Sequence, residues 1–298
     1  MTMILELRSG HSRVRVAPAL GGRITSATLG RDDGPPVAIL HSYPETAVDL
    51  LPWAKGGIYP LVPYSGRIRD AKLIHEGRVF ELAPHPGGEP HSLHGISHQR
   101  GWGIVHAGEN TAEMRYLHAP DVHWPWPFES RLRVTIEANA LRIDVSLANT
   151  GNCTMPGGVG LHPYVPYVPG DKLLYQAEPP WLYDKDFLAG GPPVGRPSKQ
   201  AVTASEFAAG EVTRFHGGLV GDLLLRRRAG PGLRFTVGDS FRHVVIHRPA
   251  GSSYACIEPV SHVADGFNLS ARGVAGAGTC ILGPGEKMNG RVEICLTS

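Results

Sequence analysis

The chain has 298 residues, and 29 Lys and Arg against 27 Asp and Glu leave a formal net charge of +2 at pH 7. So small a charge gives no indication of nucleic acid or an anionic membrane as the main partner, and we expect neither. A hydrophobic fraction of 42% is enough for a substantial core and excludes an intrinsically disordered chain.

Short strands dominate the predicted structure, because apolar and polar residues alternate with a period of two in many segments. In chain order these strands are predicted at residues 4–10, 13–19, 72–82, 111–119, 131–150, 233–239, 243–249, 254–259 and 291–298. Within 131–150 two alternating runs flank a turn at 137–140, which predicts a hairpin with one buried face. The best candidate helix, residues 203–212, is short.

The order of these elements favours one fold class. Many short strands separated by Gly and Pro are typical of a sandwich or barrel, and the absence of strand–helix alternation disfavours a doubly wound parallel sheet. No internal repeat or linker divides the chain, so we expect one all-β domain over residues 1–298.

Targeting signals are not evident in the sequence. Residues 1–10 lack a basic region followed by an apolar stretch, and no apolar run is long enough to span a membrane. The four cysteines, Cys153, Cys256, Cys280 and Cys295, show no CxxC spacing, which argues against a zinc knuckle or a redox pair. We expect free thiols and a cytoplasmic location, with no membrane partner.

Four stretches combine titratable residues with Gly, Pro and aromatic residues. They are residues 56–70, 90–102, 157–166 and 256–268. Loops of this composition on a rigid sheet are where binding and catalytic residues concentrate.

Two of these stretches carry candidate proton-transfer groups. Glu258 follows the alternating run 254–257 and precedes Pro259, so it is predicted at the end of a buried strand, where desolvation would raise its pKa. The alternative is a surface glutamate at a strand end. His162 lies between three glycines and Pro163, and it could serve as an acid or as a structural histidine that bonds a backbone carbonyl.

Metal and nucleotide sites are disfavoured by the spacing of the other candidates. His91, His94 and His98 are not on a helix, so their HxxHxxxH spacing does not put them on one face. There is no GxSxG motif, no P-loop, and no dinucleotide fingerprint in its strand–helix context. We therefore expect neither a metal nor another cofactor.

Taken together and in order, the four stretches resemble the aldose 1-epimerase (galactose mutarotase) family. The segments that carry the resemblance are "YPLVPYSGRI", "SLHGISHQRGW", "GLHPYV" and "CIEPVSHVADGFN". The resemblance extends over most of the chain, from residues 21–23 to the final strand. It implies a large antiparallel β-supersandwich of the galactose mutarotase type with few short helices.

The resemblance also implies a reaction, the interconversion of the α and β anomers of an aldose by ring opening and reclosure. By resemblance, Glu258 is the general base and His162 the general acid, on opposite sides of the sugar. His94 and Arg67 bind and polarise the sugar, and no metal or cofactor takes part. The implied partner is a small-molecule sugar, with no nucleic acid.

Further sugar contacts are less well defined by the sequence. Tyr164, Tyr64, Trp124 and Trp126 could place apolar faces against the sugar ring, although core packing is the favoured role for any one of them. Relatives carry an aspartate before the Glu258 strand, and here Asp222 is the candidate, although shifted in register; Asp184 and Asp186 are others. Gly66 stands where many relatives have asparagine.

Two alternative functions remain open at this point. A hexose-6-phosphate 1-epimerase would need added cations, for which Lys55, Arg69 and Arg100 are the candidates. A non-catalytic carbohydrate-binding or sensing protein on the same fold would lack the acid or the base. A monomer and a homodimer are both compatible with the sequence.

Overall fold

The computed structural model describes residues 3–45 and 55–297. Its regular structure is almost entirely antiparallel β, with two short helices, α1 (Ala204–Ala209) and α2 (Gly266–Ala271). Three 3-10 turns lie at Pro18–Leu20, Arg69–Ala71 and Ser97–Gln99. The expected all-β class with few short helices is confirmed.

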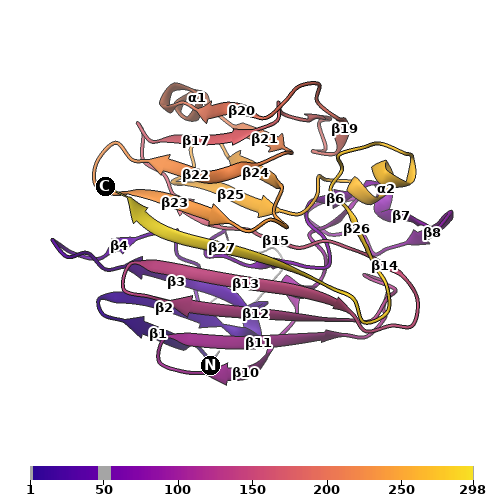
Figure 1. Ribbon diagram of the computed structural model, residues 1–298, viewed down its shortest axis with the longest axis horizontal. Coiled ribbons are helices and arrows are strands. Elements are labelled where there is room, and N and C mark those ends of the chain that lie inside the picture. Colours follow the sequence, from indigo (N-terminus) through magenta and orange to yellow (C-terminus); the bar gives the residue numbers. More distant parts are fainter. Residues whose placement is uncertain (1–2, 46–54, 298) are drawn as a thin grey trace.

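A nine-stranded sheet crosses the whole molecule (Figure 1). Its strands in spatial order are β10 (Gly103–Ala107), β11 (Thr111–His118), β12 (Phe128–Ile136), β13 (Ala140–Asn149), β27 (Lys287–Thr297), β23 (Gly232–Val237), β22 (Val220–Arg226), β17 (Lys172–Ala177) and β20 (Ser198–Val202). The long β27 joins the two halves of the sheet, because it pairs with β13 on one side and β23 on the other.

Two smaller sheets supply further layers. A four-stranded sheet contains β1 (Leu5–Ser9), β2 (Ser12–Ala17), β3 (Arg23–Leu29) and β4 (Val37–Ala38). A six-stranded sheet contains β21 (Val212–His216), β24 (His243–Arg248), β25 (Tyr254–Val260), β15 (Gly160–Leu161) and β5 (Pro60–Leu61), with β16 (Tyr164–Pro166) also paired to β25.

Two-stranded pairs complete the fold. They are β6 (Arg67–Ile68) with β9 (Ser92–Leu93), β7 (Lys72–His75) with β8 (Arg78–Glu81), β14 (Met155–Gly157) with β26 (Cys280–Leu282), and β18 (Leu182–Tyr183) with β19 (Ala189–Gly191).

One continuous hydrophobic cluster holds the sheets together. It includes Val14 of β2, Ile143 of β13, Phe235 of β23 and Ile257 of β25, so residues of all three larger sheets share one core. The predicted hairpin within 131–150 is confirmed, since β12 and β13 pair from Phe128–Asn149 to Ile136–Leu141. The alternation of apolar and polar residues therefore predicted this hairpin correctly.

One predicted strand differs from expectation. Residues 72–82 form the hairpin β7–β8 rather than one strand, because Glu76 and Gly77 both have positive φ and close a tight turn.

The predicted helix within 203–212 is confirmed as α1, whose N-terminus is capped reciprocally by Thr203 and Glu206. Helix α2 was not predicted. Within the described residues, no helix has both the length and the apolar character needed to span a bilayer.

Core packing across the sheets gives a first prediction. Ile143 is fully buried in β13, and Ile143→Ala should lower the free energy of unfolding by about 2–5 kcal/mol, because it removes buried methyl groups and leaves a cavity. The half-exposed Val105 of β10 is the control, and Val105→Ala should change stability by less than about 0.5 kcal/mol. Urea denaturation measures both, and equal losses would contradict the assignment of Ile143 to the core.

Candidate active site

A cavity of about 690 Å³ lies on the face of the six-stranded sheet that points away from the core. Successive residues of a strand face opposite sides of its sheet, so β24 and β25 each contribute to both sides. The core side holds Val244, Ile246, Ala255 and Ile257, and the cavity side holds Val245, His247, Cys256 and Glu258.

The register of the strands decides which cavity residues are neighbours. Val245 of β24 lies opposite Glu258 of β25, and His247 lies opposite Cys256. On the other side of β25, Tyr164 of β16 also pairs with Cys256. Residues directly opposite across an antiparallel pair have Cβ atoms about 4.5–5.5 Å apart. One wall of the cavity is therefore a regular grid of side chains on a rigid sheet.

Glu258 lies inside β25, not at the strand end where the sequence placed it. The following Pro259 is tolerated because the neighbouring chain is interrupted there. The amides of Ile257 and Ser261 point to that side and donate to the carbonyls of Pro163 and Val159. The missing N–H of Pro259 falls between them, where no regular ladder bond is needed.

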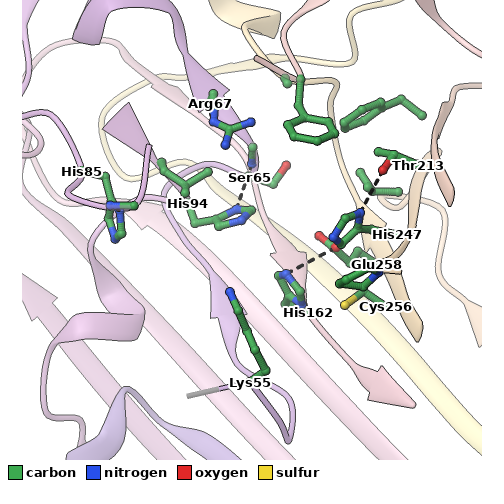
Figure 2. Close-up of a pocket in the computed structure, with 18 of the residues that line it drawn as sticks. Lys55, Ser65, Arg67, His85, His94, His162, Thr213, His247, Cys256 and Glu258 are labelled. Atoms are coloured by element: carbon green, nitrogen blue, oxygen red, sulfur yellow. Dashed lines mark hydrogen bonds and ion pairs between the residues drawn. The ribbon is translucent and has the colours of Figure 1, made fainter. Parts of the chain in front are cut away.

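His162 occupies this interruption, between β15 and β16. Its backbone N–H donates to the Tyr59 carbonyl at 3.0 Å, and its ring stacks on Tyr164 and Tyr59 with centroids 4.6 and 4.8 Å away. Its Nε2 lies 3.3 Å from Oε1 of Glu258, and both side chains are buried (Figure 2). The imidazole is thus directed at the carboxyl by packing on two aromatic rings.

Burial sets the protonation of this pair. It raises the pKa of Glu258 to about 8, against the opposing effect of the Lys55 ammonium. It also lowers the pKa of His162 well below the usual value, and the charges of Lys55 and Arg23 add to that shift. Both shifts favour a neutral carboxyl beside a neutral imidazole. Near neutral pH the pair therefore holds one proton, which it can share.

His94 is held by reciprocal hydrogen bonds with Gly66. The His94 amide donates to the Gly66 carbonyl at 2.9 Å, and the Gly66 amide donates to His94 Nδ1 at 3.1 Å. Burial lowers the pKa of His94 well below its usual value, so the ring is neutral. Because Nδ1 accepts a hydrogen bond, the ring hydrogen is on Nε2, which makes Nε2 the donor.

The backbone around His94 is strained in a way that maintains this arrangement. His94 has a φ of 60° and Gly66 a φ of 68°, and both values lie in the left-handed region. A non-glycine residue there costs about 1–3 kcal/mol. A Cβ at Gly66 would approach the Ala264 Cβ to 3.0 Å, so glycine also provides room for the chain to pass.

Arg67 reaches the cavity from β6, which pairs with β9 next to His94. Its Nη1 donates to the carbonyl of Asp186 at 2.6 Å, and its guanidinium carbon lies 5.1 Å from the centroid of the Phe187 ring. Figure 2 shows the guanidinium above Ser65 and His94, on the side of the cavity away from Lys55. Arg67 therefore provides a fixed positive charge at that side.

The profile of the aldose 1-epimerase family matches residues 3–295. The chain belongs to the aldose 1-epimerase family. Its sequence is 29% identical over 152 residues to YphB of Escherichia coli K12, itself uncharacterized, and this match covers 49% of the chain and 51% of YphB. The chain thus spans about half the length of that relative.

Solved structures show the same fold. A galactose mutarotase-like protein from Clostridium acetobutylicum superposes with a TM-score of 0.81 at 16% identity, covering 100% of this chain and 99% of that one. The GalM/aldose epimerase homologue from C. elegans gives a TM-score of 0.77 at 15% identity, with the same coverage. At such identities these neighbours establish the galactose mutarotase-like fold alone.

The cavity brings together most of the residues that the family resemblance singled out. Glu258, His162, His94, Arg67 and Tyr164 all line it, although they come from stretches far apart in the sequence. The acid and base candidates are in direct contact on one wall, which differs from the expectation that they face each other across the sugar. Their roles in the reaction remain predictions at this point.

Asp222 is not brought to the cavity. It lies on β22 of the nine-stranded sheet, partly exposed, where its carboxylate is 3.9 Å from Nε of Arg234. The sequence suggested a shifted register at this aspartate, and the structure places its strand in a different sheet from Glu258. The expected contact between Asp222 and a sugar is therefore wrong for this cavity.

The aromatic candidates other than Tyr164 are core residues. Tyr64, Trp124 and Trp126 are buried in the main hydrophobic cluster, and none of them is among the residues that line the cavity. Tyr64 and Trp124 pack with ring centroids 5.4 Å apart. The packing alternative considered for these three residues holds.

One group in the described part of the chain has the spacing of metal ligands. His162, Cys256 and Glu258 each offer one ligand atom, and these atoms lie within 4.8 Å of one another. The trio suggested by the HxxHxxxH spacing does not form such a group among the described residues. The observed group contains the His162–Glu258 pair, so the same short distances also suit proton transfer between these two side chains. That the site works without a metal stays a prediction.

Sequence reasoning missed His247 and named Lys55 only as a candidate cation for a sugar phosphate. His247 lines the cavity, and its Nδ1 lies 2.9 Å from the hydroxyl of Thr213. The alternation of segment 243–249 puts His247 on the same face as Val245, which is a signal that could have identified it. Lys55 also lines the cavity, and no local pattern in the sequence marks it.

The shifted pKa of Glu258 predicts how stability depends on pH. Between pH 4.5 and about 8 the folded protein keeps a proton that the unfolded chain releases, so stability falls as pH rises through this window. Glu258→Gln has no such proton, and its stability relative to the wild type should rise over the window, by at most about 1.4 kcal/mol per pH unit. Thermal denaturation at a series of pH values measures the difference.

A second glutamate provides the control for this prediction. Hydrogen bonds from Arg133 and Arg131 lower the pKa of Glu113, so Glu113→Gln should show no relative gain over the same window. A stability difference for Glu258→Gln that stays constant from pH 5 to 8 would mean that Glu258 is already ionised in the folded protein.

Proposed function

We propose that this protein is a cofactor-independent aldose 1-epimerase, which interconverts the α and β anomers of an aldose by opening and reclosing the ring. The observation that carries the proposal is the 3.3 Å contact between the Glu258 carboxyl and the His162 imidazole. The pair lines a cavity of about 690 Å³, which is large enough for a monosaccharide and its water.

The placement of the acid and the base side by side on one wall suits this reaction. Ring opening removes a proton from the anomeric hydroxyl and adds one to the ring oxygen, and both oxygens are bonded to the same carbon, C1. An acid and a base on one wall can therefore reach both atoms of one edge of the sugar. This supports proton transfer on a single face rather than across the ring.

The shared proton accounts for the charge balance. When the proton of the resting pair moves from Glu258 to His162, it leaves a carboxylate beside an imidazolium. The carboxylate then takes the anomeric proton while the imidazolium protonates the ring oxygen, the C1–O bond breaks, and an open-chain aldehyde forms. The pair returns to its neutral form. Rotation about C1–C2 and the reverse transfers close the ring to the other anomer.

Other residues hold the sugar in this scheme. The Nε2–H of His94 and the guanidinium of Arg67 donate hydrogen bonds to sugar oxygens. Tyr164 packs on His162 and contributes to the wall that the sugar contacts. A neutral donor at His94 can strengthen its bond as charge develops on a sugar oxygen, without releasing its own proton.

The alternative functions have less support. Arg69 and Arg100, two of the three cations considered for a sugar phosphate, are not among the residues that line the cavity; Arg69 pairs with Asp184 instead. A purely binding protein would not need the acid and base in contact. These observations favour an epimerase for a sugar without a phosphate.

Replacement of the base gives the direct test. Glu258→Gln should reduce the rate of anomer interconversion by about 10²–10⁴-fold, because the amide cannot accept the anomeric proton. Polarimetry of freshly dissolved α-glucose and α-galactose measures the rate above the spontaneous background. Asp222→Asn, outside the cavity, should retain the wild-type rate. Undiminished activity of Glu258→Gln would overturn the assignment.

The single shared proton also predicts a pH profile. The rate should be level near neutral pH and fall above about pH 8, where the pair loses its proton. Lys55 also lines the cavity and burial lowers its pKa, so Lys55→Met shows whether its titration contributes. After subtraction of the spontaneous reaction, a rate that still rises through pH 9 would contradict a singly protonated active form.

A further inference from the structure

The cavity contains few negative charges for a sugar-binding site. Among the described residues that line it, Glu258 is the one carboxylate, while Lys55 and Arg67 are cationic. The aspartate expected to contact sugar hydroxyls is elsewhere, since Asp222 lies on another sheet. With Glu258 largely neutral, the cavity is positive near neutral pH.

Arg67 is a cation of the cavity that forms no ion pair with a described carboxylate. One of its N–H groups donates to a backbone carbonyl, that of Asp186, and its Nε is buried without a hydrogen-bond partner. Within the described chain no carboxylate oxygen lies within 4.0 Å of its guanidinium nitrogens, which separates it from Arg69 and its partner Asp184. Half-burial lowers the pKa of Arg67, and the more distant carboxylates of Asp186 and Asp184 oppose that shift without reversing it, which reflects the cost of this charge. A bound anion would offset that cost.

The arrangement of the cations indicates the kind of anion. Figure 2 shows Lys55 and Arg67 on opposite sides of the cavity, so they do not converge on one group. The charge of Lys55 acts on Glu258: burial raises the pKa of Glu258 and lowers that of Lys55, and the attraction between the two groups opposes both shifts. A dianionic phosphate normally needs several convergent donors, whereas a carboxylate matches one planar guanidinium.

We propose that the preferred substrate is a hexuronate, an aldose with a carboxylate on C5, and that Arg67 binds this carboxylate. This inference rests on the proposed epimerase function. C5 and C1 flank the ring oxygen, so a pyranuronate can present its anomeric edge to His162 and Glu258 while its carboxylate extends toward Arg67. Asp184 and Asp186 act on the Arg67 guanidinium, but neither is among the residues that line the cavity, so the sugar carboxylate would be the anion that meets Arg67 inside it.

The test compares matched pairs of sugars. Anomer exchange is measured by NMR magnetisation transfer for glucuronate against glucose and for galacturonate against galactose, with glucose 6-phosphate as a further arm. We expect kcat/KM for each uronate to exceed that of its parent hexose by roughly tenfold or more, the size of one charged hydrogen-bonding contact.

Variants show whether Arg67 causes the preference. Arg67→Gln should remove the uronate advantage, and Arg67→Lys should retain part of it. Arg226→Gln, an exposed site on β22, removes the same charge outside the cavity and should leave the advantage unchanged. Equal or higher efficiency with neutral hexoses, a preference for the 6-phosphate, or an advantage that survives Arg67→Gln would each overturn the proposal.

Failure of the epimerase proposal is distinguishable from failure of this one. If the wild type accelerates no sugar, the proposed function is wrong, and calorimetry still tests the anion site. The anion site is supported if glucuronate binds more tightly than glucose to the wild type and to Glu258→Gln, and if this difference disappears in Arg67→Gln. Equal binding of the two sugars, or no binding of either, overturns the anion site.

Discussion

The site depends on one interruption in a β-ladder. His162 and Pro163 separate β15 from β16, opposite the point where Pro259 removes an amide from β25. Because neither chain needs a ladder bond there, the imidazole can turn out of the sheet and lie 3.3 Å from Glu258. The register of β24, β25 and β16 then places Val245, His247, Cys256 and Tyr164 relative to this pair.

Burial gives the contact its chemical character. An exposed carboxylate and imidazole would exchange protons with water independently, but here both groups are buried, and their pKa values shift so that they share one proton. The rings of Tyr59 and Tyr164 pack against His162, and the Gly66 amide holds the tautomer of His94. Rigid packing thus fixes the positions of these side chains, and burial sets their protonation.

Much of the candidate site was predictable from local pattern. Glu258 follows an alternating apolar run and His162 follows a glycine-rich stretch, and each precedes a proline; this local pattern marked both residues but left a structural alternative open for each until the family resemblance was added. His94 and Arg67 were found because their stretches resemble a family in order as well as in composition. The prediction that Asp222 contacts the sugar was wrong, because the spacing between motifs does not reveal which sheet a strand joins. His247 was missed because it looks like any polar residue of an alternating strand until the register sets it opposite Cys256.

The sequence by itself determined the all-β class, the central hairpin and the residue types for acid–base chemistry, because period-two alternation and proline-flanked polar residues are local properties. Only the tertiary structure decided that acid and base touch, that Asp222 lies elsewhere and that Arg67 enters the cavity without an ion pair to a described carboxylate. Those facts depend on pairings between strands distant in the chain. Such pairings are selected by burial of the whole core, and no short segment specifies them.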